Sequence, residues 1–244
     1  MSIPFLFDKV KRLKYNIIEM LLTDYQNLID KHRKEFDIYY QELVSYNDKV
    51  NLTAITERND VFTKHFLDSI LSVDAIPMNA KIVDVGTGAG FPSLPIKIVR
   101  PDVNITMVDS LNKRINFLNL ICSKLNIKST NIHSRAEEFA KKNRETFDVA
   151  VARAVAKMNT LLEYLLPLVK VGGIVIAYKG SNLAEEFMDA ENALEVLGGK
   201  VLKSIRFDLP NSYGERNIVI IEKVRETPTK YPRDKNQPKT NPIK

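Results

Sequence analysis

The sequence predicts an α/β fold in which a doubly wound, mostly parallel sheet with an antiparallel edge strand follows an N-terminal helical extension. Three observations support this prediction. Residues before about 75 place apolar side chains at helical spacing, residues from 81 onward alternate short apolar runs with amphipathic segments, and the last two apolar runs have no helical pattern between them. At 244 residues and 44% hydrophobic, the chain is long enough to bury a sizeable core.

The N-terminal extension, residues 1–75, is expected to contain three helices. Its apolar side chains recur every three or four residues, which is the spacing of one helix face. Thr56 can cap the third helix, and Pro77 marks its exit. The apolar positions are Leu13, Ile17, Ile18, Leu21, Leu22, Tyr25, Leu28 and Ile29 in the first helix, Phe36, Tyr39, Tyr40, Leu43 and Val44 in the second, and Phe62, Phe66, Ile70 and Leu71 in the third.

The region from 76 to 224 is expected to form the sheet domain. Alternating strand and helix patterns predict right-handed crossovers between parallel strands, with helices on both faces. The segments 201–209 and 216–224 then pair as the antiparallel edge. The earlier strands are expected at 81–85, 104–109, 129–134, 147–152 and 172–178, and the helices at 92–100, 111–125, 136–142, 158–169 and 182–198.

Basic residues are concentrated near both ends of the chain, although the net charge of +6 is mild. Residues 222–244 carry seven Lys or Arg against three Asp or Glu, with four prolines and no glycine. We therefore expect residues 225–244 to form a basic tail that is extended rather than packed. A second basic cluster, KVKRLK, occupies residues 9–14. Both clusters serve either solubility or contact with nucleic acid.

Membrane, secreted and metal-binding classes are not favoured. No apolar run approaches the roughly 18 residues that a membrane span needs, and the N-terminus lacks the apolar core and cleavage site of a signal peptide. A soluble, cytoplasmic protein without membrane contact is expected. Cys122, the one cysteine, lies in a predicted helix and is expected to be buried rather than nucleophilic. The three histidines lack cysteine or acidic partners at ligand spacing, so we expect no metal site.

The stretch IVDVGTGAGFPSLPI, residues 82–96, combines an apolar strand, an acidic residue and three alternating glycines, Gly86, Gly88 and Gly90. In an open parallel sheet, ligands bind beyond the carboxyl ends of the strands, and this loop is expected to lie there. Glycine allows the backbone to approach a ligand closely. The loop is therefore a candidate site for a nucleoside cofactor; the alternative is that the glycines form only a tight turn.

Two carboxylates help to identify the nucleoside. A dinucleotide site normally reads G-x-G-x-x-G, whereas this loop reads G-x-G-x-G with Phe91 at the sixth position. Asp84 would repel a pyrophosphate but suits the ammonium group of S-adenosylmethionine. Asp109, which ends the second strand, could accept the ribose hydroxyls. The pattern favours a methyltransferase over a dehydrogenase; the simpler alternative is that both carboxylates are solvated strand ends.

The methyl acceptor is inferred from the residues around the fourth strand. Enzymes that methylate an exocyclic amine often carry an Asn/Asp-Pro-Pro-aromatic turn there, whereas this chain reads VAVARAVAKM. Carbon methylation would require an activated thiolate, and Cys122 lies elsewhere. A ring nitrogen such as guanine N7 accepts a methyl group without a general base. We therefore assign no catalytic residue and interpret Arg153 as a cofactor-pocket or positioning group.

Several separated stretches together resemble one family. These are NLTAIT at 51–56, HFLDS at 65–69, DVGTGAGFPSLPI at 84–96, DSLNKR at 109–114, SRAEEF at 134–139, ARA at 152–154 and GERNIVIIEK at 214–223. Over about residues 40–223 the chain resembles RsmG, also called GidB, the bacterial 16S ribosomal RNA guanine-N7 methyltransferase family. The resemblance implies a Rossmann-like class I S-adenosylmethionine-dependent methyltransferase, expected to be a monomer, whose partner is 16S ribosomal RNA or the small ribosomal subunit.

The resemblance also implies roles for individual residues. Arg135 joins Arg153 as a positioning candidate. Simpler alternatives are that Asn51 only stabilises a turn, that His65 is a polar helix-face residue and that Arg216 pins the antiparallel edge. The implied cofactor contacts are Gly86, Phe91, Ala136, Glu137 and Arg153, and the implied contacts to RNA or in support of catalysis are Asn51, His65, Lys113, Arg135 and Arg216.

The chain departs from the family pattern at two places. Tyr46 stands where the family often has tryptophan, and the tail YPRDKNQPKTNPIK lacks the glycine that is common there. Two other functions remain open from the sequence. One is a non-catalytic, RNA-binding ribosome-assembly factor, and the other is a small-molecule methyltransferase with a helical lid.

Overall fold

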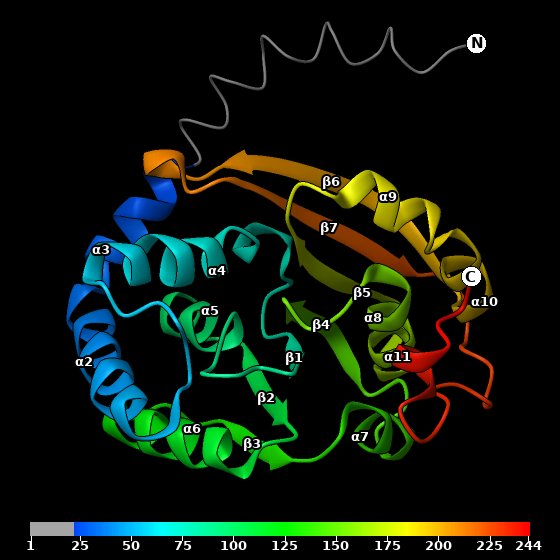
Figure 1. The fold of residues 1–244 in the computed structure, drawn as a ribbon, viewed down its shortest axis with the longest axis horizontal. Coiled ribbons are helices and arrows are strands. Elements are labelled where there is room, and N and C mark those ends of the chain that lie inside the picture. Colours follow the sequence, from blue (N-terminus) through cyan, green and yellow to red (C-terminus); the bar gives the residue numbers. More distant parts are fainter. Residues whose placement is uncertain (1–21) are drawn as a thin grey trace, which may run out of the picture.

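The computed structural model describes residues 22–244. The basic cluster KVKRLK and the first part of the first predicted helix lie outside these residues. The described chain forms a seven-stranded sheet with helices on both faces (Figure 1). Within residues 22–244, none of the helices combines the length and the apolar character that crossing a bilayer requires.

The strand order in the sheet is β3-β2-β1-β4-β5-β7-β6. Strands β1 to β5 pair in parallel, whereas β7 runs antiparallel to both β5 and the outermost strand β6. The predicted fold class is therefore confirmed. The chain order reverses between β1 and β4, which is where such sheets bind ligands. The strands are β1 Lys81–Val85, β2 Asn104–Asp109, β3 Thr130–His133, β4 Phe147–Arg153, β5 Val169–Lys179, β6 Gly199–Asp208 and β7 Glu215–Lys223.

Two apolar cores lie on opposite faces of the sheet. Ile82 and Val83 are consecutive in β1 and therefore point to opposite faces. Ile82 belongs to the core built with the N-terminal helices, α5 and α6, and Val83 to the core built with α7, α8 and α10. Cys122 is buried, as predicted. The helices are α5 Ser93–Val99, α6 Asn112–Lys124, α7 Ala136–Lys142, α8 Met158–Leu165, α9 Leu183–Met188 and α10 Glu191–Leu197, with short η3 Leu166–Leu168 and η4 Pro210–Ser212.

The single helix predicted over 182–198 is two helices in the structure. No residue of α9 is buried, whereas α10 buries Ala193 and Leu197. The break after Met188 reorients the chain so that the apolar side of α10 lies against α8. The sequence period alone did not reveal this change of direction.

The N-terminal extension packs its aromatic side chains against the sheet domain. Residues 22–31 are helical, α2 is the second helical stretch, and a third stretch begins after residue 57. The predicted cap is wrong, because that stretch begins after Glu57, and the Thr56 carbonyl instead accepts a hydrogen bond from Tyr40 Oη at 3.2 Å. The elements here are α2 Arg33–Val50, α3 Arg58–Asp60, the π-helix η1 Val61–Leu67, α4 Asp68–Ile70 and η2 Val73–Ala75.

The C-terminal tail, residues 225–244, packs on the sheet domain instead of extending from it, which corrects the prediction from composition. Glu163 of α8 is fully buried, and its carboxylate accepts hydrogen bonds from Arg233 Nε at 2.9 Å and Nη2 at 2.7 Å. A buried carboxylate needs such a cationic partner. A short helix, α11 Gln237–Thr240, also lies against α8. The tail is thus held by specific polar contacts.

Candidate active site

The glycine loop follows β1 at the carboxyl edge of the sheet. The Gly86 amide donates a hydrogen bond to the Val108 carbonyl of β2 at 2.8 Å. Gly90 has φ of 102°, and a Cβ there would lie 2.7 Å from Tyr39 Oη, so a side chain would collide with that buried tyrosine. Gly88 has φ of 62°, and no atom lies within 4 Å of where its Cβ would be. The loop is therefore fixed on one side and open on the other.

Asp84 lies beneath this loop and is fully buried. Its Oδ2 accepts hydrogen bonds from Thr87 Oγ1 at 2.9 Å and from the Ser93 amide at 3.2 Å. Its Oδ1 has no hydrogen-bond partner among residues 22–244. Burial raises the pKa of Asp84 to about 7, against the opposing effect of the hydrogen bonds from Ser93 and Thr87. A cation held by the loop would stabilise the ionised form.

Asp109 ties the loop to the start of α6. Its Oδ2 accepts hydrogen bonds from the Gly88 amide at 3.0 Å and from Arg114 Nη1 at 3.1 Å, and its Oδ1 accepts one from the Leu111 amide at 2.9 Å. Contact with ribose hydroxyls would use the carboxylate lone pairs that these bonds leave. That role stays a prediction.

Phe91 stacks between the N-terminal helices and β4. Its ring centroid lies 4.5 Å from that of His65, with the planes 22° apart, and 5.5 Å from that of Tyr39. Arg153 places its Cζ 4.9 Å from the same centroid. Two residues predicted to contact the cofactor, Phe91 and Arg153, are therefore in contact with each other, and both contact His65.

His65 is held in one neutral tautomer by its two neighbours. Arg153 Nη2 lies 3.0 Å from His65 Nδ1, and because a guanidinium only donates, Nδ1 must accept. The proton is then on Nε2, which donates to Thr53 Oγ1 at 2.9 Å. Burial, reinforced by the nearby charge of Arg153, lowers the pKa of His65 to about 3. His65 is therefore neutral, and its Nδ1 accepts a hydrogen bond from Arg153.

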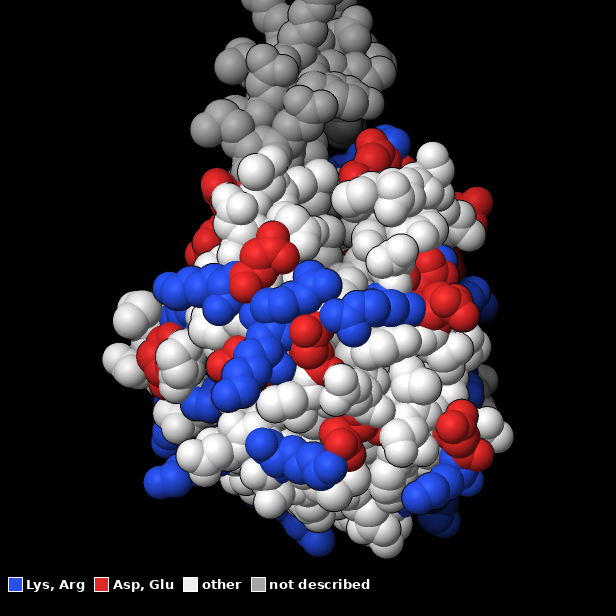
Figure 2. Space-filling model, turned by 90° about the vertical axis from the view of Figure 1, so that its left-hand side faces the viewer, with Lys and Arg blue, Asp and Glu red and all other residues white. Residues whose placement is uncertain are grey.

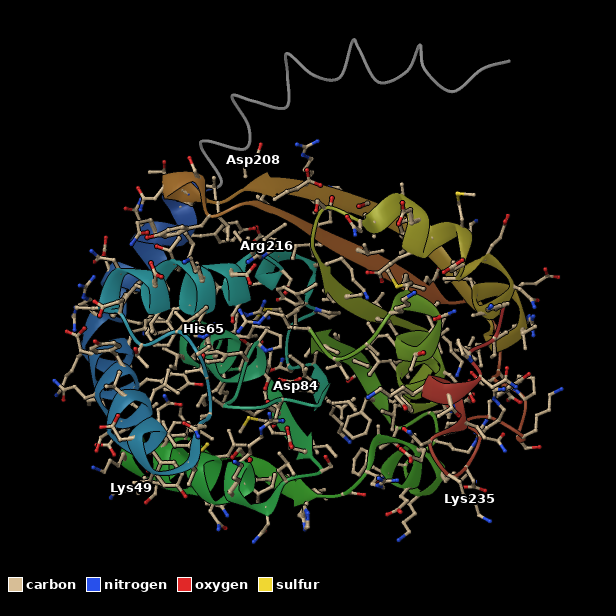
Figure 3. All side chains as sticks on the ribbon, in the orientation of Figure 1. Lys49, His65, Asp84, Asp208, Arg216 and Lys235 are labelled. Atoms are coloured by element: carbon tan, nitrogen blue, oxygen red, sulfur yellow. The ribbon has the colours of Figure 1, made fainter. Side chains whose placement is uncertain are left out.

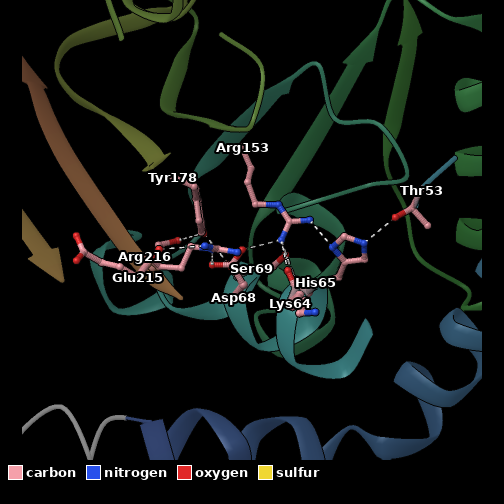
Figure 4. Close-up of polar contacts among 10 residues, drawn as sticks. Thr53, Lys64, His65, Asp68, Ser69, Arg153, Tyr178, Glu215 and Arg216 are labelled. Atoms are coloured by element: carbon pink, nitrogen blue, oxygen red, sulfur yellow. Dashed lines mark hydrogen bonds and ion pairs between the residues drawn. The ribbon is translucent and has the colours of Figure 1, made fainter. Parts of the chain in front are cut away.

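Asp68 joins Arg153 to Arg216 (Figure 4). Its side chain is 2% exposed, and Oδ2 accepts a hydrogen bond from Arg153 Nη1 at 2.9 Å. Oδ1 lies 3.3 Å from Arg216 Nε without hydrogen-bond geometry. The three residues come from α4, β4 and β7, so this cluster links the N-terminal extension to the sheet domain. We call Thr53, His65, Asp68, Arg153 and Arg216 the arginine cluster.

Sequence reasoning missed Asp68, Thr53 and Tyr178 as parts of this site. Asp68 follows His65 by three positions, which places both on one side of a helical segment, and that spacing was an available clue. Tyr178 Oη donates to the Ser69 carbonyl at 2.6 Å and so supports α4 from β5. The tyrosine ends an ordinary apolar strand pattern, which carries no such clue.

The arginine cluster contains only some of the residues expected to contact RNA or support catalysis. Figure 3 shows His65, Asp84 and Arg216 in the central part of the molecule, with Lys235 of the tail toward its edge. Asn51 is the left-handed residue after α2, next to Val50, whose carbonyl accepts a hydrogen bond from Lys113 Nζ at 2.7 Å. The structure therefore groups Asn51 with Lys113, outside the cluster.

The first turn of α7 holds the remaining predicted residues. Ala136 and Glu137 begin this helix, and Glu137 is buried. Arg135 Nη1 lies 3.6 Å from Glu137 Oε1, and the Arg135 side chain is largely exposed. Arg135 is thus not in the arginine cluster with Arg153, the other positioning candidate.

Comparison with known proteins gives one consistent family. The family model described as "GidB: rRNA small subunit methyltransferase G" matches residues 32–219. The chain is 46% identical over 230 residues to "Ribosomal RNA small subunit methyltransferase G" of Lactococcus lactis subsp. lactis (strain IL1403), covering 91% of this chain and 96% of that protein. It is 48% identical over 225 residues to the protein of the same name from Ligilactobacillus salivarius, covering 89% of this chain and 93% of that protein.

Solved structures show the same fold at low sequence identity. One example is the ribosomal protein L11 methylase from Lactobacillus delbrueckii subsp. bulgaricus, with a TM-score of 0.51 and 18% identity over 66% of this chain and 79% of that chain. At this identity the likeness concerns the fold alone.

Proposed function

The chain belongs to the family of rRNA small subunit methyltransferase G, and from this premise we propose that it transfers a methyl group from S-adenosylmethionine to N7 of a guanine in 16S ribosomal RNA. One observation supports the proposal most strongly: the open glycine loop and the arginine cluster contact each other at one edge of the sheet, through the stacked rings of Phe91 and His65.

The residues at the loop fit S-adenosylmethionine. Asp84 is a buried carboxylate with an unpartnered oxygen and no contacting Lys or Arg within residues 22–244, so a cationic ligand at the loop is favoured. Gly88 leaves open space where a side chain would stand. The residues proposed to hold the cofactor are Asp84, Gly86, Gly88, Gly90, Phe91, Asp109, Ala136, Glu137 and Arg153.

The chemistry needs little from the protein beyond positioning. S-adenosylmethionine, when bound, supplies an activated methyl group that the lone pair of guanine N7 can accept in a single displacement. No proton has to leave N7, and both ring nitrogens of His65 are already engaged by Arg153 and Thr53. The absence of a free base in this cluster is consistent with a ring-nitrogen acceptor.

Arg153 is proposed to position the reacting groups. Its guanidinium is fixed by Asp68, His65 and the ring of Phe91, so it cannot relax away from the loop without breaking several contacts. Orientation of this kind can supply a large share of a rate enhancement, because effective molarities of about 10⁵ M or more are attainable. Asn51, Lys113 and Arg135 are proposed to contact RNA around this centre.

We also propose that the protein acts as a monomer in the cytoplasm. Within residues 22–244, the chain covers both faces of its sheet with its own helices. The C-terminal tail packs on the same chain through the contact between Arg233 and Glu163. Light scattering on the purified protein tests the monomer, and a dimeric mass would contradict it.

The proposed reaction is tested with labelled S-adenosylmethionine and 16S ribosomal RNA, supplied both deproteinised and within small subunits. Borohydride reduction followed by aniline cleaves RNA at N7-methylguanine, so reverse transcription should stop at one guanine. Label found only at an exocyclic amine would reject N7. RNA binding with no transfer to any RNA would favour the assembly-factor function, and transfer to a metabolite alone would favour a small-molecule enzyme.

A further inference from the structure

Outside the site, two arginines lie over aromatic rings at the surface of the N-terminal extension. Arg33 places its Cζ 4.4 Å from the ring centroid of Phe62, and Arg58 places its Cζ 4.9 Å from the same centroid and 5.2 Å from that of Tyr40. We call these four residues the arginine–aromatic surface. Figure 2 shows Lys and Arg side chains gathered in a band across this face of the molecule, with acidic side chains between them.

We propose that the arginine–aromatic surface binds the phosphate backbone of the RNA whose guanine is methylated. This inference rests on the proposed function and adds a second contact region to it. It concerns residues that have no contact with the glycine loop or with Arg153.

Contact with the rings prepares both guanidinium groups to bind phosphate. An arginine held over an aromatic ring loses less freedom when it meets a phosphate, and the guanidinium N–H groups match phosphate oxygens in pairs. Arg33 and Arg58 are 46% and 41% exposed. Their protein acceptors within residues 22–244 are only Asp30 and Asp37, so most of their ten N–H donors remain for a ligand.

Two carboxylates contact the two arginines of this surface. Asp37 lies 2.5 Å from Arg58 Nη2 and 3.3 Å from Arg33 Nε, so this carboxylate is shared by both cations. Asp30 lies 3.5 Å from Arg33 Nη1. Because all these side chains are partly exposed, solvent screens the pairs, and the guanidinium groups can exchange a carboxylate for a phosphate.

Packed aromatic rings connect the surface to the site. Phe62 meets Phe66 edge-on with centroids 5.0 Å apart, and Phe66 lies 6.1 Å from Phe91 of the glycine loop. Phe62 also belongs to η1, which carries His65. Phosphates bound by the arginine–aromatic surface would thus sit in a fixed relation to a base held near Arg153.

RNA fits this surface better than a protein partner. Single-stranded RNA offers phosphates to guanidinium edges and bases to planar groups, and this surface alternates guanidinium groups with aromatic rings. Lys64, which lies in η1 with Phe62, makes a second cation–ring contact, with its Nζ 4.0 Å from the ring centroid of Tyr213.

The test compares RNA affinity over a range of NaCl concentrations for the full-length protein and its variants. Replacing both arginines, R33Q/R58Q, should weaken binding of 16S ribosomal RNA about tenfold or more and should make the log–log salt slope shallower by roughly 1.4 to 1.8, as expected for two lost phosphate contacts. R33K/R58K should keep most of the slope. The affinity for S-adenosylmethionine, measured by calorimetry, should not change in either variant.

Lys170 provides the matched control. It is 47% exposed and pairs with Asp148 at 2.8 Å, but it lies at the amino end of β5, away from the site. Lys170→Gln should leave the RNA affinity and the salt slope unchanged. A slope for R33Q/R58Q equal to that of the wild type, or a loss no larger than that of Lys170→Gln, overturns the proposal.

A third variant is expected to bind RNA more tightly, a result that loss of folding cannot produce. Asp37→Asn keeps both arginines and removes the shared carboxylate, so it should tighten RNA binding, whereas Asp148→Asn should not. Weaker or equal binding by Asp37→Asn contradicts the proposal. If R33Q/R58Q loses RNA binding but the wild type methylates no guanine N7, the RNA-binding surface is supported and the proposed function fails. If the wild type methylates guanine N7 but R33Q/R58Q binds RNA as tightly as the wild type, only the RNA-binding surface is rejected.

Discussion

Asp68 and Asp84 are both buried carboxylates near the glycine loop, but they differ in what surrounds them. Asp68 lies between Arg153 and Arg216, each within 3.3 Å of one of its oxygens. Asp84 receives only hydrogen bonds from Thr87 and Ser93, and one of its oxygens has no partner among the described residues.

This difference separates two uses of a buried charge. A carboxylate that is paired in the folded chain holds other groups in place, and removing it leaves those groups unpaired. A buried carboxylate without a contacting cation raises the free energy of the unliganded protein, and a cationic ligand lowers that free energy when it binds. We therefore infer that Asp68 supports the site and that Asp84 serves the ligand.

The largest effect is expected from Asp68→Asn. The substitution keeps the size of the side chain but leaves Arg153 and Arg216 without their anion, which should destabilise the fold by about 3 to 5 kcal/mol. Misplacement of Arg153 should also lower turnover about 100-fold. Thermal unfolding and methyl transfer to 16S ribosomal RNA measure the two effects.

Asp102 gives a control for the loss of an arginine pair. Asp102 Oδ1 and Oδ2 accept hydrogen bonds from Arg100 at 2.7 and 2.8 Å, at the end of the sheet opposite the site. Asp102→Asn should lower stability and leave turnover per folded molecule unchanged. If Asp68→Asn behaves in the same way, Asp68 does not position Arg153 for the reaction.

Asp84→Asn should change stability little and should weaken cofactor binding. The amide removes a buried charge that no cation contacts, so at pH 8 the free energy of unfolding should fall by less than about 1 kcal/mol or should rise. The affinity for S-adenosylmethionine should fall tenfold or more, which corresponds to about 1.4 kcal/mol. Calorimetry and thermal unfolding on the same sample decide the matter, because a stability loss as large as that of Asp68→Asn would mean that Asp84 is already compensated.

The affinity for S-adenosylmethionine should depend on pH through Asp84. The pKa of Asp84 is raised to about 7, so the carboxylate is mostly protonated at pH 6 and mostly ionised at pH 7.5. If only the ionised form binds, affinity should rise roughly eightfold over that interval. Stability of the free protein should instead fall as pH rises from about 4 to 7, because the folded form holds the proton more tightly than the unfolded form does. A flat binding profile, or an equal dependence in Asp84→Asn, would contradict this role.

The sequence predicted Asp84 and its glycine loop, but it did not reveal Asp68 and the arginines that pair with it. Asp84 was found because strand, acid and glycine loop are consecutive, and the alternation of strands and helices placed that loop at the correct edge of the sheet. Asp68 of α4 was missed because its partners, Arg153 and Arg216, come from β4 and β7, and no local pattern joins the three residues. Its own motif, HFLDS, was recognised without its contacts.

The C-terminal tail was mispredicted for the same reason. Its prolines and charges are typical of an extended segment, but the decisive partner is Glu163, 70 residues before Arg233. A buried glutamate inside the apolar helix 158–165 is the clue that the chain offers, because such a carboxylate requires a cation from another part of the molecule. Composition of the tail alone could not supply that partner.

The smallest effect on activity is expected at Thr53, which reaches Arg153 only through His65. Thr53→Val keeps the shape of the side chain and removes the acceptor for His65 Nε2–H, so the folded state should lose about 1 to 2 kcal/mol and turnover should fall a few-fold. Thr53→Ser keeps the hydroxyl and should behave like the wild type. Because the pKa of His65 is lowered to about 3, its imidazole should remain neutral from pH 8 down to pH 5, with the proton on Nε2.

Imidazole ¹⁵N chemical shifts report that tautomer directly in the wild type and in Thr53→Val. The linkage has a definite sign: the unfolded chain takes up a proton at His65 near its ordinary pKa of 6.5, whereas the folded chain does not until about 3, so stability should fall as pH drops through that window. Replacing His65 with Asn should remove this contribution, while the contribution of Asp84, which favours the folded state at low pH, should persist. A protonated His65 at pH 6 would show that Nδ1 does not accept a hydrogen bond from Arg153. Asp68 would then hold Arg153 without help from His65.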